Sequence, residues 1–216
     1  MYKPDNENLK KVNYRARNKY NIPTIIGYPD YDEQVEYIGF NYCKTMERAG
    51  DTEYGVHFFL DDYQFNRIWN NPDKYMPLLA KFRCVLSPDF SLYLDYPKAV
   101  QIYKHYQKHW IGRYMQEHGI KVIPTICWSD KESYKWCFDG EPRESVVAVS
   151  SIGTQRNEKS KQLFLDGYAE MIRQLKPTKV LFWGNIPAEL DRRDIIVPMG
   201  YIMDEKFKLL RIGKTS

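Results

Sequence analysis

YGVHFFLDD, residues 54–62, is a short apolar run, rich in aromatic residues, that ends at two adjacent carboxylates. Such a run predicts a buried strand, because a polar pair is costly anywhere but at the exposed end of the strand. Adjacent residues of a strand point to opposite faces, so Asp61 and Asp62 cannot both face one pocket unless the chain turns between them. Asp61, on the side of Phe59, is the predicted inward carboxylate, and Asp62 is predicted to cap the next turn.

The same order of apolar run, small polar cluster and helix recurs along the chain. The region 60–82 is predicted to be an interrupted helix in which Pro72 opens a turn, and Gly119 is predicted to close the longest helix. Further strands are predicted at residues 22–27, 84–86, 121–128, 145–151, 179–185 and around 195–197. Helices are predicted at residues 32–49, 97–118, 131–138 and 158–175.

Strands that alternate with helices at intervals of about 25 residues imply parallel strands joined by helical crossovers. Near-continuous apolar strands agree, since parallel strands are covered on both faces. Two architectures fit: an irregular or incomplete (β/α) barrel-like fold of about six to seven mostly parallel strands, or an open doubly wound parallel sheet. The strand count and the lack of an early Gly-rich turn favour the barrel. It would be trimmed, because the chain has 216 residues and a full barrel typically has about 250.

The composition is that of an ordinary globular domain, with 43% hydrophobic and 28% charged residues and a net charge of +4. The basic residues are spread out, unlike those of a typical nucleic-acid binder. We expect a basic N-terminal arm (1–21), a single α/β domain (22–203) and a C-terminal tail (204–216). The start lacks the apolar core of a signal peptide, and no stretch approaches the ~20 apolar residues that cross a bilayer. With four cysteines and no CxxC pair, we expect a reduced, cytoplasmic protein without disulfides or membrane contact.

Three carboxylates at predicted strand ends are the candidate catalytic residues. In either architecture, ligands bind at the carboxyl ends of parallel strands. Asp61, Asp89 and Asp130 could converge there on a divalent cation or divide general acid and base roles. The alternative is that they cap helices, a contact worth about 1 kcal/mol.

Small and aromatic residues at the same ends are the candidate ligand-binding residues. In SSIGT, residues 150–154, a glycine among small side chains would let backbone N–H groups approach a phosphate, with Arg156 just beyond. A tight turn with a Ser or Thr cap is the alternative. Trp128 and Trp183 could stack on a base or sugar, or could plug the end of a barrel. The ligand-binding candidates are Ser87, Trp128, Ser150, Ser151, Gly153, Thr154, Trp183 and Asn185.

His105 and His109 stand four positions apart on the longest predicted helix, the spacing of two metal ligands on one helical face. The stretch HYQKH lacks the Glu that follows the first His in the metalloprotease motif, and both residues lie on a flank of the apolar stripe. We therefore interpret them as surface histidines rather than zinc ligands. Cys84 and Cys127 are interpreted as small core residues. The sequence identifies no metal and no cofactor.

The segments VHFFLDDYQF, KFRCVLSPDFS, KVIPTICWSD and CFDGEPRESVVAVSSIGT together resemble the DUF4417 family of domains of unknown function, found in bacteria, phages and other mobile elements. The resemblance covers about residues 54–185, and LSPDFS and IPT-x-x-W-x-D are its most distinctive segments. It implies a phage or mobile-element setting but no reaction. It places residues 87–91, Trp128, Asp130, 138–140 and 150–153 among the motif positions of the family.

Two functions from different classes remain open. In the first, the polar rim binds or processes a phosphorylated or nucleotide-like small molecule. In the second, the protein is a non-catalytic binding protein that engages a host protein or nucleic acid through Tyr- and Trp-rich surfaces and its basic arm, whose binding to nucleic acid would weaken with salt. The clustering of polar residues at strand ends, rather than on one basic stripe, favours the first.

Overall fold

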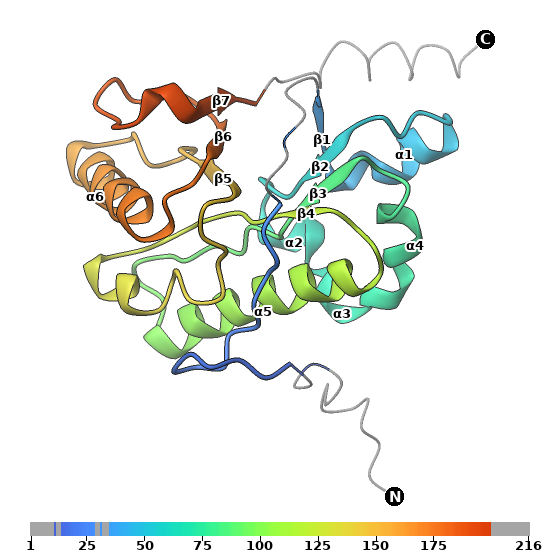
Figure 1. Cartoon of the computed structure of the whole chain (residues 1–216), viewed down its shortest axis with the longest axis horizontal. Coiled ribbons are helices and arrows are strands. Elements are labelled where there is room, and N and C mark those ends of the chain that lie inside the picture. The colour runs from blue at the N-terminus through green and yellow to red at the C-terminus, as the bar shows by residue number, and fades with distance from the viewer. Residues whose placement is uncertain (1–10, 12–13, 29–30, 32–34, 200–216) are drawn as a thin grey trace, which may run out of the picture.

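Seven short parallel strands organise the part of the chain that this computed structural model describes, residues 11, 14–28, 31 and 35–199 (Figure 1). The fold is mixed α/β with two parallel sheets. The first sheet has the order β1 (Tyr37–Gly39), β2 (Gly55–His57), β3 (Cys84–Leu86) and β4 (Val122–Ile123). The second has the order β5 (Val146–Ser150), β6 (Lys179–Trp183) and β7 (Ile196–Pro198).

The two sheets meet just beyond β4. Thr125 forms a parallel bridge with Ala148 of β5. The Ala148 amide donates to the Pro124 carbonyl, and the Ala148 carbonyl accepts from the Ile126 amide, both at 2.8 Å. The strand order therefore follows the chain order across both sheets. One buried cluster takes side chains from strands of both: Tyr37, Cys84, Leu86, Ile123, Val146, Ala148 and Leu181.

Two long helices cover the sheets, and shorter ones fill the connections. The α5 helix places Trp110, Ile111 and Met115 in the core of the first sheet. The α6 helix places Phe164 and Tyr168 in that of the second. The helical elements are η3 (Phe40–Tyr42), α1 (Cys43–Arg48), α2 (Asp62–Phe65), α3 (Arg67–Asn70), η4 (Pro72–Lys74), α4 (Met76–Leu79), α5 (Lys98–Glu117), η5 (Lys131–Lys135), α6 (Glu158–Leu175) and η6 (Arg193–Ile195).

The strongest sequence signals are confirmed. The α6 helix has the predicted bounds and begins after Asn157, whose side chain accepts from the Ser160 amide at 2.9 Å. The α5 helix lies within one residue of its predicted bounds, and Gly119 follows it with a φ of +74°, a conformation that favours glycine. The β3 strand matches its prediction, and Pro72 opens η4 as expected.

The strand predicted at residues 22–27 is wrong. Ile22 and Ile25 are fully buried, but none of the strands in the described part of the chain pairs with this segment. Instead, the Gln116 side chain of α5 accepts from the Ile26 amide at 2.9 Å and donates to the Ile26 carbonyl at 2.7 Å. A side chain thus satisfies backbone groups that a sheet would otherwise pair.

The single helix predicted at residues 32–49 is also wrong. Residues 32–34 lie outside the described part, and the rest divides into β1, η3 and α1. Ile38 in β1 and Met46 in α1 are both buried in the same core. The apolar residues of a strand and a helix therefore lie, in the sequence, at the spacing that one face of a single helix would have. The predicted strands at 54–62 and 121–128 are shorter than expected, because the Phe59 amide donates to the His57 side chain and Pro124 has no amide to donate.

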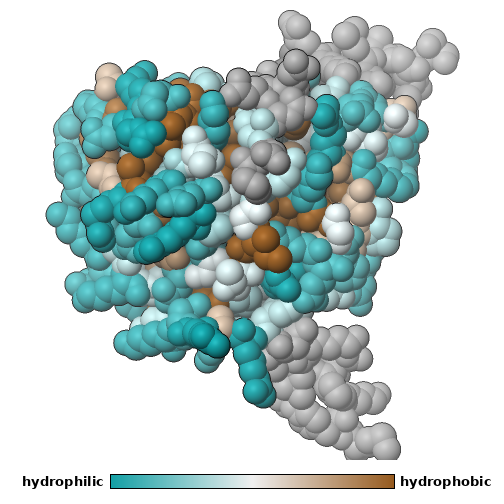
Figure 2. All heavy atoms as spheres, viewed as in Figure 1, coloured by the Kyte–Doolittle hydropathy of each residue, from teal (hydrophilic) through white to brown (hydrophobic). Residues whose placement is uncertain are grey.

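The domain boundaries stay predictions, because much of the arm and the whole tail (204–216) lie outside the described residues. None of the described helices is both long and apolar enough to cross a bilayer. Hydrophilic residues cover most of the face in Figure 2, and hydrophobic ones reach its surface only in small groups. None of the four cysteines, all within the described part, forms a disulfide.

Candidate functional site

One cleft, with a volume of about 740 Å³, opens where the loops after β2, β3, β4 and β5 meet the first turns of α6. The carboxyl ends of parallel strands share one edge, so these loops come together from distant parts of the chain. The lining includes Asp61, residues 89–94 and 126–129, Ser150, Ile152 to Thr154, Arg156 and Asn157, and Ser160, Leu163 and Phe164 of α6.

Asp89 lies half-buried in the wall of this cleft. Burial raises the pKa of its carboxyl group to about 7, and the nearby negative charge of Asp62 adds to this rise. The positive charge of Lys108 and a hydrogen bond with the Cys127 side chain act in the opposite direction. A group with a pKa near neutrality can both take and give a proton, as a general acid or base must.

The two neighbouring aspartates have different surroundings. Asp61 is exposed, lines the cleft and makes no side-chain capping bond to α2. Asp62 is not a helix cap, contrary to the prediction. Its carboxylate accepts from the amide and the hydroxyl of Ser91 and pairs with the Lys104 ammonium at 3.0 Å. Asp61 therefore faces the cleft, and Asp62 anchors one of its loops.

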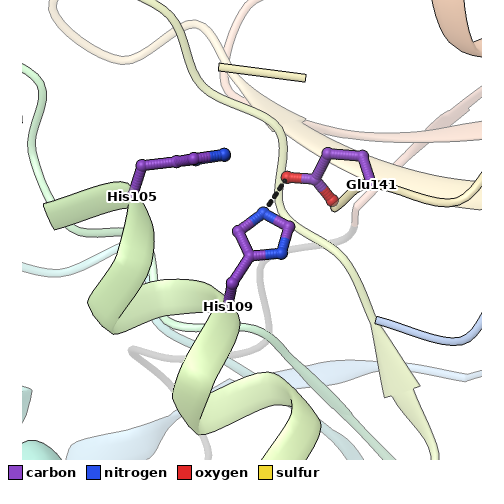
Figure 3. A group of neighbouring side chains, drawn as sticks. All are labelled: His105, His109 and Glu141. Atoms are coloured by element: carbon purple, nitrogen blue, oxygen red, sulfur yellow. Dashed lines mark hydrogen bonds and ion pairs between the residues drawn. The ribbon is translucent and has the colours of Figure 1, made fainter. Parts of the chain in front are cut away.

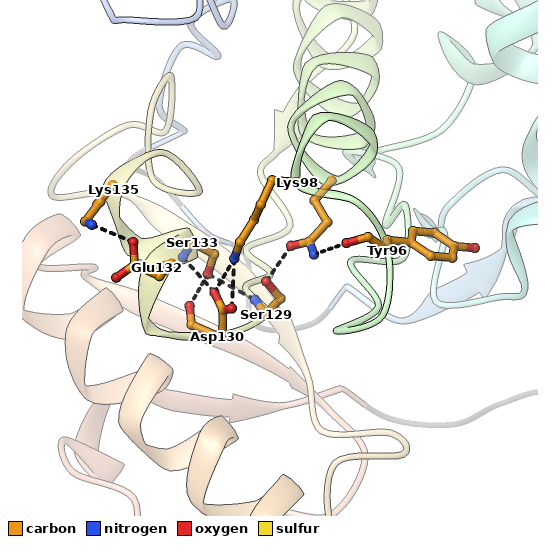
Figure 4. A network of polar contacts seen from close by, with 8 residues as sticks. Tyr96, Lys98, Ser129, Asp130, Glu132, Ser133 and Lys135 are labelled. Carbon is orange, nitrogen blue, oxygen red and sulfur yellow. Dashed lines mark hydrogen bonds and ion pairs between the residues drawn. The ribbon is translucent and has the colours of Figure 1, made fainter.

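Asp130 caps η5 rather than lining the cleft (Figure 4). Its carboxylate accepts from the Ser133 amide at 3.0 Å and from the Lys98 ammonium at 2.7 and 2.8 Å. Burial acts to raise the pKa of Asp130, but the bonds from Lys98 and Ser133 outweigh it and hold the pKa below its usual value. These contacts correspond to the capping alternative for this residue.

Trp128 forms an aromatic part of the cleft lining. Its ring lies 5.4 Å from that of Phe164, centroid to centroid, and its indole N–H donates to the Leu163 carbonyl at 3.2 Å. A Cβ atom at Gly167 would lie only 2.0 Å from the indole nitrogen. The Trp128 ring can therefore lie here only because Gly167 of α6 has no side chain.

The loop between β5 and α6 brings Ser150, Gly153 and Thr154 to the cleft with Arg156. The Ser150 hydroxyl accepts from the Ile152 amide at 3.2 Å, and Gly153 has a φ of +79°. Hydroxyl groups and a guanidinium near the start of a helix favour an anion, because the helix dipole is positive there.

The other ligand-binding candidates are not among the cleft-lining residues and make internal contacts. The Ser87 hydroxyl accepts from the Thr125 amide at 2.8 Å, between β3 and β4. The Ser151 hydroxyl donates to the Asn185 carbonyl at 2.7 Å. Trp183 is 8% exposed, and its ring centroid lies 4.4 Å from that of His57, whose pKa burial lowers to about 4.

The comparison with known families agrees with the resemblance seen in the sequence. The family model described as Domain of unknown function (DUF4417) matches residues 14–201. The chain belongs to the DUF4417 family.

Two curated relatives of this DUF4417 chain come from phages. The chain is 33% identical over 176 residues to the Gene 1 protein of Mycobacterium phage L5, which covers 82% of this chain and 76% of the relative. It is 32% identical over 176 residues to the Gene 1 protein of Mycobacterium phage D29, covering 82% of this chain and 64% of the relative. The chain thus spans less than two thirds of the D29 protein. No solved structure is significantly similar to this chain.

A buried polar cluster of this DUF4417 chain includes two residues that the sequence predicts to lie at the surface. His105 and His109 are 1% and 0% exposed, so the prediction that they are surface histidines is wrong. The N-terminal segment and the loop after η5 cover this flank of α5: the Pro23 carbonyl contacts His109, and the Asp139 carbonyl contacts His105. The helical spacing of the histidines was visible in the sequence, but nothing local to them reveals the segments that cover them.

Proposed function

We propose that the cleft binds a small phosphorylated, nucleotide-like molecule and that Asp89 exchanges a proton with it. The observation that carries this proposal is that three kinds of group line one cleft. They are an anion-favouring loop before α6, an aromatic wall and a carboxyl group with a pKa near 7. Convergent polar groups and a perturbed pKa in a cleft are typical of binding and active sites.

The phosphate would bind at the loop before α6. Arg156 and the hydroxyl-bearing Ser150 and Thr154 line this side of the cleft. A guanidinium recognises phosphate through two parallel hydrogen bonds, and the Ser150 hydroxyl adds a further donor, whereas the Thr154 hydroxyl donates to the Ser151 carbonyl at 2.7 Å. The 18-residue helix that follows adds the positive end of its dipole.

The ring of the ligand would bind against the aromatic wall. Trp128 and Phe164 form part of the lining, and Tyr93 is 56% exposed at the same cleft. Stacking of a base on an aromatic side chain contributes about 1–3 kcal/mol and tolerates different bases. Asp89 lies on the same lining, within the cleft that such a ring would enter.

We further propose that the seven strands form an incomplete (β/α) barrel. Three observations support this. The strands pair in parallel in both sheets, their order follows the chain, and one buried cluster contains side chains from both sheets. A doubly wound sheet would reverse its order at one point, which is where its ligand binds. In a barrel, the carboxyl ends of the strands carry the site.

The phage origin of the relatives supports a role in a phage or another mobile element, inside the cytoplasm of the host cell. A second candidate function is non-catalytic binding of a host protein or nucleic acid. One observation favours it: Tyr93, Leu94 and Ile152 are 56%, 55% and 65% exposed at the cleft. Exposed apolar side chains that gather at one place on the surface often mark interaction sites.

The test measures binding to the purified chain by thermal shift and titration calorimetry. The probes are inorganic phosphate and nucleoside mono-, di- and triphosphates. We expect at least one nucleotide to bind, and we expect Arg156→Gln to weaken that binding by roughly 10- to 100-fold, the cost of one charge-assisted hydrogen bond. Arg143→Gln is the matched control, because Arg143 is exposed and does not line the cleft.

Asp89→Asn is the second variant. If Asp89 exchanges a proton with the ligand, the affinity changes more between pH 6 and 8 in the wild-type chain than in Asp89→Asn, in which only the second ionisation of the phosphate remains. A wild-type chain that binds none of these probes overturns the proposal. Salt-sensitive binding of DNA or RNA by the same protein would then support the second candidate function.

A further inference from the structure

We propose that His105, His109 and Glu141 form a buried binding site for a divalent transition-metal ion of the zinc class (Figure 3). The two histidines project from adjacent turns of α5, and the glutamate comes from the loop after η5. This site is separate from the cleft, whose lining includes none of the three residues. The inference goes beyond the proposed ligand function and does not depend on it.

The three residues offer ligand atoms within a small volume. One atom from each lies within 4.8 Å of the other two, and all three residues are buried. The His109 Nε2 atom and the Glu141 Oε1 atom are 2.9 Å apart. Zinc binds nitrogen and oxygen ligands at about 2.0–2.2 Å, so two ligands of one ion lie roughly 3–3.5 Å from each other. Small movements of these side chains would bring them to coordination distance.

Each histidine already makes the second contact that metal-bound histidines need. The His109 Nδ1 atom lies 2.8 Å from the Pro23 carbonyl oxygen, and the His105 Nε2 atom lies 3.0 Å from the Asp139 carbonyl oxygen. A carbonyl oxygen only accepts, so these two nitrogens carry the hydrogens. In a neutral imidazole, the other nitrogen then has a free lone pair, and a backbone carbonyl that fixes the tautomer is typical of metal-binding histidines.

This assignment leaves a lone pair of His109 facing a carboxylate oxygen. Two acceptors 2.9 Å apart repel each other unless a proton or a metal ion lies between them. Two further atoms of the cluster, His105 Nδ1 and Glu141 Oε2, are buried without a hydrogen-bond partner among the described residues. Buried polar atoms without partners are rare in folded proteins. One cation bound by all three side chains would satisfy them together.

The competing explanation is a purely protein ion cluster. The Lys108 ammonium lies 2.6 Å from Glu141 Oε1 and 2.8 Å from the Thr125 carbonyl. A doubly protonated His109 would add a second cation to that same oxygen. This alternative accounts for His109, but it leaves His105 Nδ1 and Glu141 Oε2 without a partner in the described part of the chain. With Lys108 on Oε1, the carboxylate still offers Oε2 to a metal.

Imidazole and carboxylate ligands are those of zinc, manganese and iron sites. The contacts of this site join α5, the segment around Pro23 and the loop after η5, three parts that are distant in sequence. Metal binding would therefore stabilise the contacts between these three parts of the fold. Two histidines and one carboxylate also leave a coordination position for a water molecule.

The first test uses the wild-type chain, purified without a polyhistidine tag from medium supplemented with zinc, manganese and iron. We expect about one equivalent of metal per chain by mass spectrometry, and a nitrogen and oxygen shell at about 2.0–2.2 Å by X-ray absorption. Removal of the metal with a chelator should lower Tm, and added Zn²⁺ should restore it. A chain that is free of metal, and whose Tm does not change with Zn²⁺, Mn²⁺ or Fe²⁺, overturns the proposal.

The second test separates the metal site from the ion cluster through His105. His105→Gln leaves Lys108, Glu141 and His109 in place, so an ion cluster would survive it. The metal proposal instead expects loss of the bound metal and of the Zn²⁺-dependent rise in Tm. His118→Gln is the matched control, because His118 lies just after the same helix and is exposed. Retention of metal by His105→Gln at the wild-type level would rule out the three-ligand site.

Discussion

Asp62 engages both hydrogen-bond donors of Ser91, accepting from its amide at 3.1 Å and from its hydroxyl at 2.9 Å. Ser91 belongs to the loop that carries Asp89 and lines the cleft. The carboxylate of Asp62 therefore connects the start of α2 to the wall of the cleft.

Asp62→Ala should destabilise the protein and loosen the loop of residues 89–94. Loss of the bonds to Ser91 and of the ion pair with Lys104 should lower the free energy of unfolding by about 1–3 kcal/mol. Urea unfolding measures the loss, and hydrogen exchange shows whether the Ser91 amide loses protection. Asp61→Ala is the control, expected within about 0.5 kcal/mol of wild type, because Asp61 is exposed. Equal losses in both variants would contradict the anchoring role.

Asp89 should make the stability depend on pH in a defined direction. The pKa of its carboxyl is about 7 in the folded state and about 3.9 in the unfolded state, so the folded state binds the proton more tightly. The contribution of this group is complete below pH ~4 and is lost as the pH rises through about 7. Asp89→Asn removes this loss, because its amide does not ionise.

At pH 8 we expect Asp89→Asn to be more stable than wild type by about 1–2 kcal/mol, less than the full shift implies because solvent screens a half-buried carboxyl. At pH 4 the two proteins should have similar stability. Urea unfolding between pH 4 and 8 measures the difference. A difference that stays constant with pH would show that Asp89 ionises normally.

Gly167→Ala should displace Trp128 from the cleft wall. The new Cβ would lie 2.0 Å from the indole nitrogen, and the rigid ring must move to make room. Overpacking of this kind costs about 1–3 kcal/mol. Gly112→Ala on α5 is a milder control, because its Cβ would meet the flexible end of Ile25 at 2.6 Å. Thermal unfolding compares the variants, and a larger loss at Gly112 would be the contrary result.

Lys108→Met should be among the most destabilising substitutions on α5. It leaves Glu141 without its ammonium partner in a site where both side chains are at most 1% exposed. Breaking a buried ion pair by removing one partner costs about 3–5 kcal/mol. Lys98, on the same helix, forms an exposed ion pair with Asp130 of the loop before η5. Lys98→Met breaks that pair, which should change the free energy of unfolding by no more than about 1 kcal/mol. Urea unfolding of both variants at pH 7 decides, and similar losses would contradict the expected difference.

Helices and strands could be predicted from the sequence where the spacing of their apolar residues fits only one kind of element. The α6 helix combines an Asn cap with apolar residues at helical spacing, and β5 is a run of β-formers, so each has one reading. The sequence does not predict β1, because Ile38 and Met46 lie at helical spacing although they belong to different elements. The segment 22–27 is apolar like a strand, but Gln116 takes the place of a strand neighbour.

The candidate site, too, could be predicted from the sequence only in part. The rule that parallel strands end at one edge places Asp61, Asp89, Trp128 and the loop 150–154 near one another, and most of this group lines the cleft. That rule cannot say which way a side chain turns. Ser87, at the end of β3, bonds to Thr125 instead. The contact of His109 with Glu141 joins residues 32 positions apart, and no local pattern encodes such a contact.

The position of the segment around Ile25 also affects how the protein folds during its synthesis on the ribosome. The Ile25 amide bonds to the Gly140 carbonyl, and the Tyr28 amide bonds to the Ser145 hydroxyl 117 positions later. At a synthesis rate of about 5–20 residues per second, roughly 6 to 23 seconds pass between the two partners. Throughout that interval the segment that carries Ile22 and Ile25 lacks these two hydrogen bonds, which gives a nascent-chain chaperone a defined apolar segment to shield.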